Sequence, residues 1–138
     1  MDTFAVLCVM TPRDEHTQIL TEAFAIAGER DPSLLLTVSD ESAATELFKV
    51  SHLLVCHGSD PAAPSAILRA QELGLPVLAV DGESAEQLIE NGRSGFIVSG
   101  GALPLADAIR WLAHRAPVRE RLRTGGLLAA GARLALSA

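Results

Sequence analysis

Tyrosine is absent from this 138-residue chain, aromatic residues make up 4% of it, and Lys49 is its only lysine. A core with so little aromatic bulk must be built from Leu, Ile, Val and Ala. The 49% hydrophobic content is enough for one compact core, so we expect a single domain over residues 1–138. A net charge of −6 and a pI of about 5.1 argue against nucleic acid as a partner.

Cysteine and long apolar runs are scarce as well. Cys8 and Cys56 each lie inside a short apolar run, where a free thiol behaves as a small hydrophobe. Two cysteines and no secretory pattern predict a reducing, cytoplasmic location. No apolar stretch approaches the ~20 residues that a membrane-spanning helix needs, and no spacing of His, Cys, Asp and Glu is typical of a metal site. We therefore expect no membrane span, no metal and no cofactor.

What the sequence does contain is a set of short, continuous apolar runs, at residues 4–9, 34–38, 52–56, 76–80 and 95–98. Continuous runs of this length are typical of strands that helices cover on both faces. Helical patterns separate the runs, which predicts a parallel sheet with right-handed crossovers. We therefore expect an α/β, Rossmann-like domain of about five parallel strands, with any ligand beyond their carboxyl ends.

Several residues indicate where the helices begin and end. Helices are expected at residues 16–30, 41–50, 61–73 and 102–115, with a last one after Pro117. Asp60 before Pro61 is typical of an N-cap, and Gly74 of a C-terminal stop. Ser84 followed three residues later by Gln87 has the spacing of a capping box. Glycines are expected to weaken the last helix at Gly125, Gly126 and Gly131.

The loops after the expected strands are poorly suited to phosphate. The loop "MTPRDEH" has no glycine to bring backbone N–H groups to an anion, and it carries Asp14 and Glu15. Arg13 could contact a phosphate as a point charge, although a lone loop arginine is usually just solvated. The loop "DGESAE" is acidic and would repel a phosphate.

The loop "HGSDP" brings His57, Ser59 and Asp60 together in sequence. A catalytic triad is normally assembled from separated positions, with the nucleophile on a strained turn. Adjacent positions do not match that arrangement, and Asp60 is better explained as an N-cap. We therefore expect no catalytic residue in this loop or elsewhere in the chain.

Four segments in register carry a family resemblance: "GLPVLAV" (74–80), "QLIENGRSGFIV" (87–98), "LADAIRWLA" (105–113) and "RERLR" (119–123). Together they resemble the C-terminal, nucleotide-sugar-binding half of retaining glycosyltransferases of the two-Rossmann-domain (GT-B) type. The order and spacing match over about residues 60–125, and more loosely toward the first strand. The acceptor half that such enzymes carry has no counterpart in this sequence.

The resemblance also implies where a donor would bind, and the chain departs from the family there. Family members carry two glutamates, separated by seven residues, that contact the donor sugar and the ribose. These positions fall on Pro61 and Arg69, and that of the phosphate-binding lysine falls near Glu15. The glycine pair of the fourth loop falls on Glu83 and Ser84, beside Gly82. A diphosphate would lose charge-assisted hydrogen bonds of ~1.5–3 kcal/mol each and gain repulsion.

Two functions follow. The first is a GT-B-derived domain that is not catalytic alone and serves as a binding, scaffolding or regulatory module. The second is a donor-binding fragment or split subunit of a nucleotide-sugar-dependent glycosyltransferase. A receiver-like signalling domain fits less well, because its lysine after the last strand is missing. Any weak contact with a nucleotide or nucleotide sugar is expected from Arg13, His57, Ser59, Asp60, Arg69, Gly82 and Ser84.

The C-terminal segment combines arginines with leucines. Six of the ten arginines follow residue 109, and the leucines of the segment are Leu122, Leu127, Leu128, Leu134 and Leu136. The arginines alone are typical of a solvated helix face. The leucines either fold back onto the domain's own sheet or form an exposed patch, which usually marks an interface. We expect the C-terminal helix to bind a protein partner or to form a homodimer.

Overall fold

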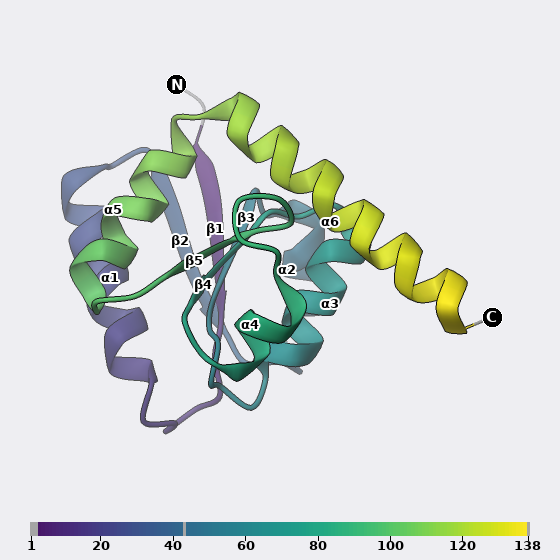
Figure 1. Cartoon of the computed structure of the whole chain (residues 1–138). Coiled ribbons are helices and arrows are strands. Elements are labelled where there is room, and N and C mark those ends of the chain that lie inside the picture. Colours follow the sequence, from purple (N-terminus) through teal and green to yellow (C-terminus); the bar gives the residue numbers. More distant parts are fainter. Residues whose placement is uncertain (1–2, 43, 138) are drawn as a thin grey trace.

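The computed structural model describes residues 3–42 and 44–137 of the chain. Five parallel strands form one sheet in the order β2-β1-β3-β4-β5 (Figure 1). The strands are β1 (Phe4–Val9), β2 (Leu34–Ser39), β3 (Leu53–His57), β4 (Val77–Val80) and β5 (Phe96–Val98). The expected Rossmann-like α/β fold is therefore confirmed. The strand order is that of flavodoxin-like doubly wound sheets.

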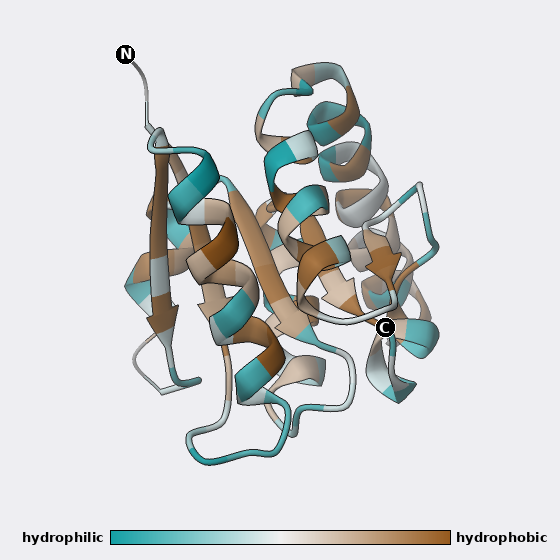
Figure 2. Ribbon diagram, turned by 90° about the vertical axis from the view of Figure 1, so that its left-hand side faces the viewer, coloured by the Kyte–Doolittle hydropathy of each residue, from teal (hydrophilic) through white to brown (hydrophobic). Residues whose placement is uncertain are grey.

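Helices cover both faces of this sheet. They are α1 (Thr17–Arg30), α2 (Thr45–Val50), α3 (Ala63–Leu73), α4 (Glu83–Leu88), α5 (Ala102–Ala113) and α6 (Ala116–Ser137). One hydrophobic cluster joins α1 and α5 to the sheet, and a second joins α2, α3 and α4 to it. Figure 2 shows the brown, apolar strands lying behind and between these helices.

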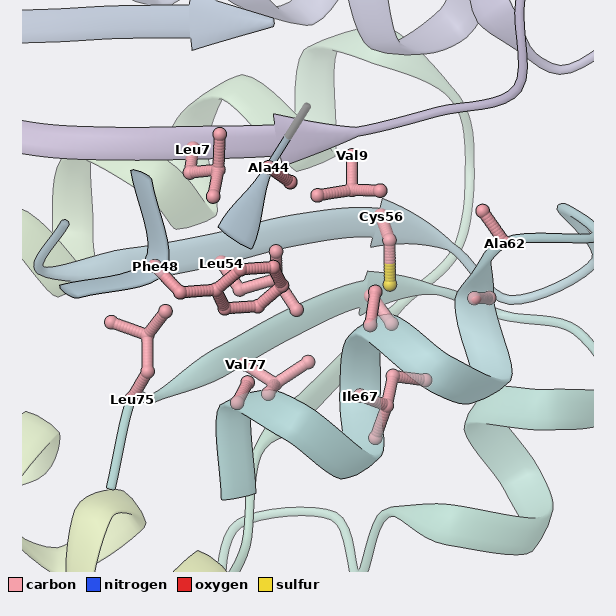
Figure 3. Close-up of a cluster of buried hydrophobic side chains, with 14 of the residues drawn as sticks. Leu7, Val9, Ala44, Phe48, Leu54, Cys56, Ala62, Ile67, Leu75 and Val77 are labelled. Carbon is pink, nitrogen blue, oxygen red and sulfur yellow. The ribbon is translucent and has the colours of Figure 1, made fainter. Parts of the chain in front are cut away.

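The core follows from the alternation of side chains along each strand. On β1, Val6 points toward α1 and α5, whereas Leu7 points toward α2 and α3. Phe48, Leu54 and Ile67 meet in the second cluster (Figure 3). Both faces of the central strands are therefore dry, which is why their sequences are continuously apolar.

Some helix ends differ from expectation. Helix α3 begins at Ala63 after an N-cap at Ala62, so Asp60 is not its N-cap. Ser84 lies inside α4, whose N-cap is Gly82, and no side chain caps that helix. Helix α2 begins at Thr45 rather than at residue 41, and residue 43 lies outside the described residues. Gly74 does end α3, in the left-handed conformation with φ of 72°.

Helix α6 is a single, unbroken helix of 22 residues. Its glycines do not interrupt it, because two of them lie where the helix touches the body of the domain. A Cβ on Gly125 would stand 1.9 Å from the carbonyl oxygen of Arg93, and one on Gly126 would touch Gln71. These glycines let α6 approach the 90–94 turn and α3 closely. Within the described part of the chain, no helix is long and apolar enough to cross a membrane.

Candidate functional site

The crevice of the sheet lies between β1 and β3. Strand order reverses there, since β2 lies on one side of β1 and β3 on the other. Helix α1 leaves β1 toward one face, and α3 leaves β3 toward the other. The loops that follow the two strands therefore diverge, and ligands of open α/β sheets bind in the opening between them.

The Asp60 carboxylate accepts the hydrogen bonds of the donors that line this opening. Its Oδ2 accepts the backbone N–H of Thr11 at 3.0 Å, and its Oδ1 accepts the Thr11 hydroxyl at 2.6 Å. Oδ1 also accepts the backbone N–H of Ala62 at 2.8 Å. The residue is only 2% exposed. Asp60 therefore joins the β1 and β3 loops, and an incoming anion would have to displace its carboxylate from these donors.

Two histidines whose rings lie close together, tilted by 30°, are found beside this contact. The rings of His16 and His57 are 4.0 Å apart between centroids. The Ser59 backbone N–H donates to Nδ1 of His57 at 3.1 Å, so that nitrogen carries no proton and Nε2 does. Burial, and then the neighbouring His16, lower the pKa of His57. The structure therefore favours a neutral His57.

The second histidine, His16, is hydrogen-bonded to an aspartate of its own loop. Nδ1 of His16 lies 2.7 Å from Oδ2 of Asp14. This hydrogen bond is the main reason that the pKa of Asp14 is lowered. A carboxylate that orients an imidazole is a common catalytic element. Ser59, however, contacts His57 through its backbone N–H rather than its hydroxyl, so no Ser–His–Asp relay is formed.

Two glycines lock the β3 and β4 loops against each other. A Cβ on Gly82 would stand 2.5 Å from the backbone of Gly58 and Ser59, and one on Gly58 would stand 2.6 Å from the Val80 carbonyl. The Ser84 backbone N–H donates to the carbonyl of Gly58 at 3.0 Å. That N–H is engaged in the fold, so it is not available to a phosphate.

Among the described residues, neither of the two arginines expected at the site forms a hydrogen bond with this cluster. Arg13 is exposed and adopts a left-handed backbone with φ of 64°, which is uncommon for a residue with a side chain. Arg69 lies on α3 with its guanidinium carbon 6.0 Å from the ring centroid of Phe48. It lines a hollow of about 210 Å³ with Ser65 and Glu41, which are hydrogen-bonded to each other. That hollow is smaller than the ~300–1,000 Å³ of typical ligand pockets.

The structure thus places six of the seven expected site residues at the carboxyl edge of the sheet. They are Arg13, on the loop after β1, and His57, Ser59, Asp60, Gly82 and Ser84. Sequence reasoning placed the 10–13 and 57–61 loops at the site, but it missed His16 and the part that the Thr11 side chain plays in holding Asp60. The position of Thr11 two residues after the end of β1 was the available signal, because that loop borders the switch point. Within residues 3–42 and 44–137, no group of three His, Cys, Asp or Glu side chains could hold a metal ion.

The buried cysteines add no nucleophile. Cys8 and Cys56 are both fully buried in neighbouring strands. Burial, together with the charge of Asp60, raises the pKa of Cys56 to about 12, and burial also raises that of Cys8. A thiol that stays protonated does not attack a substrate.

Comparison with known proteins decides the family. The sequence profile described as glycosyl transferases group 1 matches residues 17–127, which is more than half of the chain. This chain belongs to that family. A comparison with curated protein sequences gives no match.

Solved structures show which part of longer enzymes with this fold the chain resembles. The C-terminal domain of a glycosyl transferase group 1 family protein, LpcC, from Francisella tularensis superposes with a TM-score of 0.79 at 12% identity, over 97% of this chain and 88% of that domain. HepE from Anabaena, in complex with UDP and glucose, gives a TM-score of 0.76 at 19% identity over 96% of this chain. At these identities the likeness shows the GT-B C-terminal fold.

The longer relatives extend well beyond this group 1 chain. It covers 44% of HepE and 32% of the pneumococcal O-GlcNAc transferase GtfA, which was solved with UDP and GlcNAc. GtfA gives a TM-score of 0.69 at 13% identity, over 94% of this chain. The chain therefore spans less than half of each longer enzyme.

Proposed function

We propose that this group 1 domain does not catalyse glycosyl transfer by itself and acts as a cytoplasmic binding or scaffolding module. The observation that carries the proposal is the Asp60 carboxylate at the switch point. It holds the N–H and hydroxyl of Thr11 and the N–H of Ala62. A bound diphosphate needs donors of this kind, and here an acid of the chain itself already occupies them.

The charge around the crevice supports the same conclusion. Asp14, Glu15, Asp81 and Glu83 lie on the loops and helix start at the carboxyl edge, where Arg13 is the single arginine. Like charges repel a diphosphate, and one solvated arginine offsets little of that repulsion. A nucleotide sugar is therefore expected to bind no more tightly than ~100 μM.

The surface proposed for a protein partner lies on α6. Leu122 is buried against the domain, which agrees with the alternative that leucines of this helix pack onto the domain's own sheet. Leu128 and Leu136 are 70% and 88% exposed, and the end of α6 projects past the other helices (Figure 1). A groove of about 900 Å³ runs between α6 and the 90–94 turn, with Pro117 and Leu128 among its lining residues. Exposed apolar patches rimmed by charge usually mark interfaces.

A binding titration tests the catalytic half of the proposal. Isothermal calorimetry with UDP-, GDP- and ADP-glucose is expected to show no binding tighter than ~100 μM and no hydrolysis. The Asp60→Ser variant is the matched comparison, because it removes the resident carboxylate. Tight binding of a nucleotide sugar by the wild-type chain, with release of nucleotide, would overturn the proposal.

A second candidate function is a donor-binding subunit that another chain completes. Family membership favours it, as does the match to part of longer enzymes that were solved with UDP. One structural relative was solved as a complex, GtfA/B, at 12% identity and a TM-score of 0.75. Nucleotide-sugar binding in the micromolar range would favour this function over the non-catalytic one.

A further inference from the structure

Strand β2 forms one edge of the sheet and is bordered by β1 alone. Its sequence, LLLTVS, contains no charge, proline or glycine. Natural edge strands are usually protected by lysine, proline, a bulge or a covering element, because their free N–H and C=O groups pair with other chains. The β2 edge lacks these protective features.

The register of β2 shows which backbone groups face outward. The carbonyls of Ser33 and Ser39 accept the N–H groups of Phe4 and Met10, so odd-numbered residues face β1. The even-numbered residues, Leu34, Leu36 and Val38, therefore direct their N–H and C=O groups away from the sheet. Only the Leu34 N–H has a partner among the described residues, the Asp31 carbonyl at 3.2 Å.

We propose that β2 pairs with β2 of a second copy of this chain, antiparallel and centred on Leu36. The outward-facing residues Leu34, Leu36 and Val38 are placed symmetrically about Leu36, as a two-fold axis at that residue requires. The Leu36 N–H then donates to the Leu36 carbonyl of the other copy, and each Val38 N–H donates to the opposite Leu34 carbonyl. The pairing leaves the Leu34 N–H with Asp31. A continuous sheet of two domains results.

The side chains on β2 fit the same register. Val38 is 45% exposed on the α1 face, where the pairing sets it opposite Leu34 of the second copy. Leu35 is 55% exposed on the other face, opposite Thr37. Apolar cross-strand neighbours of this kind are the stabilising unit of sheets. The proposal is independent of the crevice and of α6, and it leaves both α6 surfaces of the dimer open.

Oligomeric state under matched substitutions gives the first test. We expect light scattering of the full chain to give twice the 14.5 kDa mass, with Val38→Lys increasing the dimer dissociation constant at least ~10-fold. Leu128→Lys is the matched control, because it places the same charge on an exposed side chain of α6, and it should leave the dimer intact. A wild-type chain that stays monomeric up to ~1 mM, or a dimer that Leu128→Lys dissociates and Val38→Lys does not, overturns the proposal.

A designed cross-link tests the register directly. In the proposed pairing, Leu35 and Thr37 of opposite copies form a non-hydrogen-bonded pair with Cα atoms about 4.5 Å apart, within the ~4.4–6.8 Å that a disulfide spans. The Leu35→Cys/Thr37→Cys double variant is expected to form a covalent dimer on oxidation. Leu35→Cys alone should not, because its two copies lie on a diagonal about 7–8 Å apart. Cross-linking by the single variant and not by the double one would refute the register.

Discussion

The Thr11 hydroxyl donates to Asp60 Oδ1 at 2.6 Å, across the point where the strand order of the sheet reverses. Two residues 49 positions apart in the sequence thereby fix the loops of β1 and β3 to each other. In open α/β sheets the same opening is the usual place for a ligand. Here it is bridged by the chain's own side chains, and the first two predictions concern this contact.

Replacing Asp60 by alanine should destabilise the fold. The change leaves the Thr11 and Ala62 N–H groups without their acceptor in a buried position, which costs about 2–4 kcal/mol. Urea unfolding measures the loss. Glu83→Ala, which removes an exposed acid at the same edge, is the control and should change stability by no more than ~0.5 kcal/mol.

The same carboxylate should control anion binding. Asp60→Ser frees two backbone N–H donors and removes a negative charge, so inorganic phosphate should raise the Tm of this variant more than that of the wild type. Differential scanning calorimetry with and without phosphate compares the two proteins. Equal Tm shifts would mean that Asp60 does not exclude phosphate from the crevice.

Acid should weaken the fold in two steps. The pKa of His57 is lowered from 6.5 by burial and by His16, so its stabilisation is complete above pH 6.5 and is lost as the pH falls below that value. The pKa of Asp14 and of Asp31 is lowered from 3.8, so their contributions are lost at lower pH still. Unfolding free energies measured from pH 8 to pH 3 should show both declines.

The matched variant for this pH dependence is His57→Gln. It removes the titrating ring and should flatten the profile just below pH 6.5 while leaving the decline below pH 4. Glu83→Gln, an exposed change nearby, should follow the wild-type curve. A wild-type decline that persists in His57→Gln would assign it to another group.

Two glycines of α6 should respond to alanine in opposite directions. Gly125→Ala places a Cβ 1.9 Å from the Arg93 carbonyl oxygen, so α6 must shift at a cost of about 1–3 kcal/mol. Gly131→Ala meets nothing within 4 Å and should stabilise the helix by roughly 0.5–1 kcal/mol. Thermal unfolding of the two variants compares them directly, and equal effects would show that α6 is not held at Gly125.

Arg119 should matter more than its neighbouring arginines. Its guanidinium donates to the carbonyls of Leu112 and Ala113 at 2.7 and 2.9 Å and lies over the Phe4 ring at 4.8 Å. Arg119→Ala therefore leaves the end of α5 without its donor and should cost about 2 kcal/mol. The exposed Arg121→Ala is the control and should change stability little. Similar losses in both variants would show that charge, not capping, is responsible.

Much of the fold could be predicted because it depends on local pattern. Strands covered on both faces need continuous apolar runs, so all five were located within a residue or two of their observed ends. Gly74 could be assigned because only glycine readily adopts a left-handed helix stop. The family resemblance rested on several segments in register, and the group 1 profile confirms it.

The site could be predicted only in outline. The sequence placed His57, Ser59 and Asp60 on one loop, yet it assigned Asp60 to a helix cap. A carboxylate can accept N–H groups from either its own helix or a distant loop, and the choice depends on which donors the fold brings near. Here Asp60 accepts the N–H and hydroxyl of the distant Thr11 as well as the N–H of Ala62, and Ala62 itself takes the N-cap position.

By itself the sequence determined the class of the fold and the order of its elements, and it supported the resemblance to the family that the group 1 profile confirms. Only the tertiary structure decided that Asp60 joins the β1 and β3 loops and that Gly125 lies against the 90–94 turn. It also decided that Leu122 is buried while Leu128 is exposed. The physical reason is the same in each case. Apolar periodicity and turn preference act between residues that are close in the chain. The contacts of a hydrogen-bond donor, a glycine or a leucine depend instead on packing between segments that are far apart in the chain.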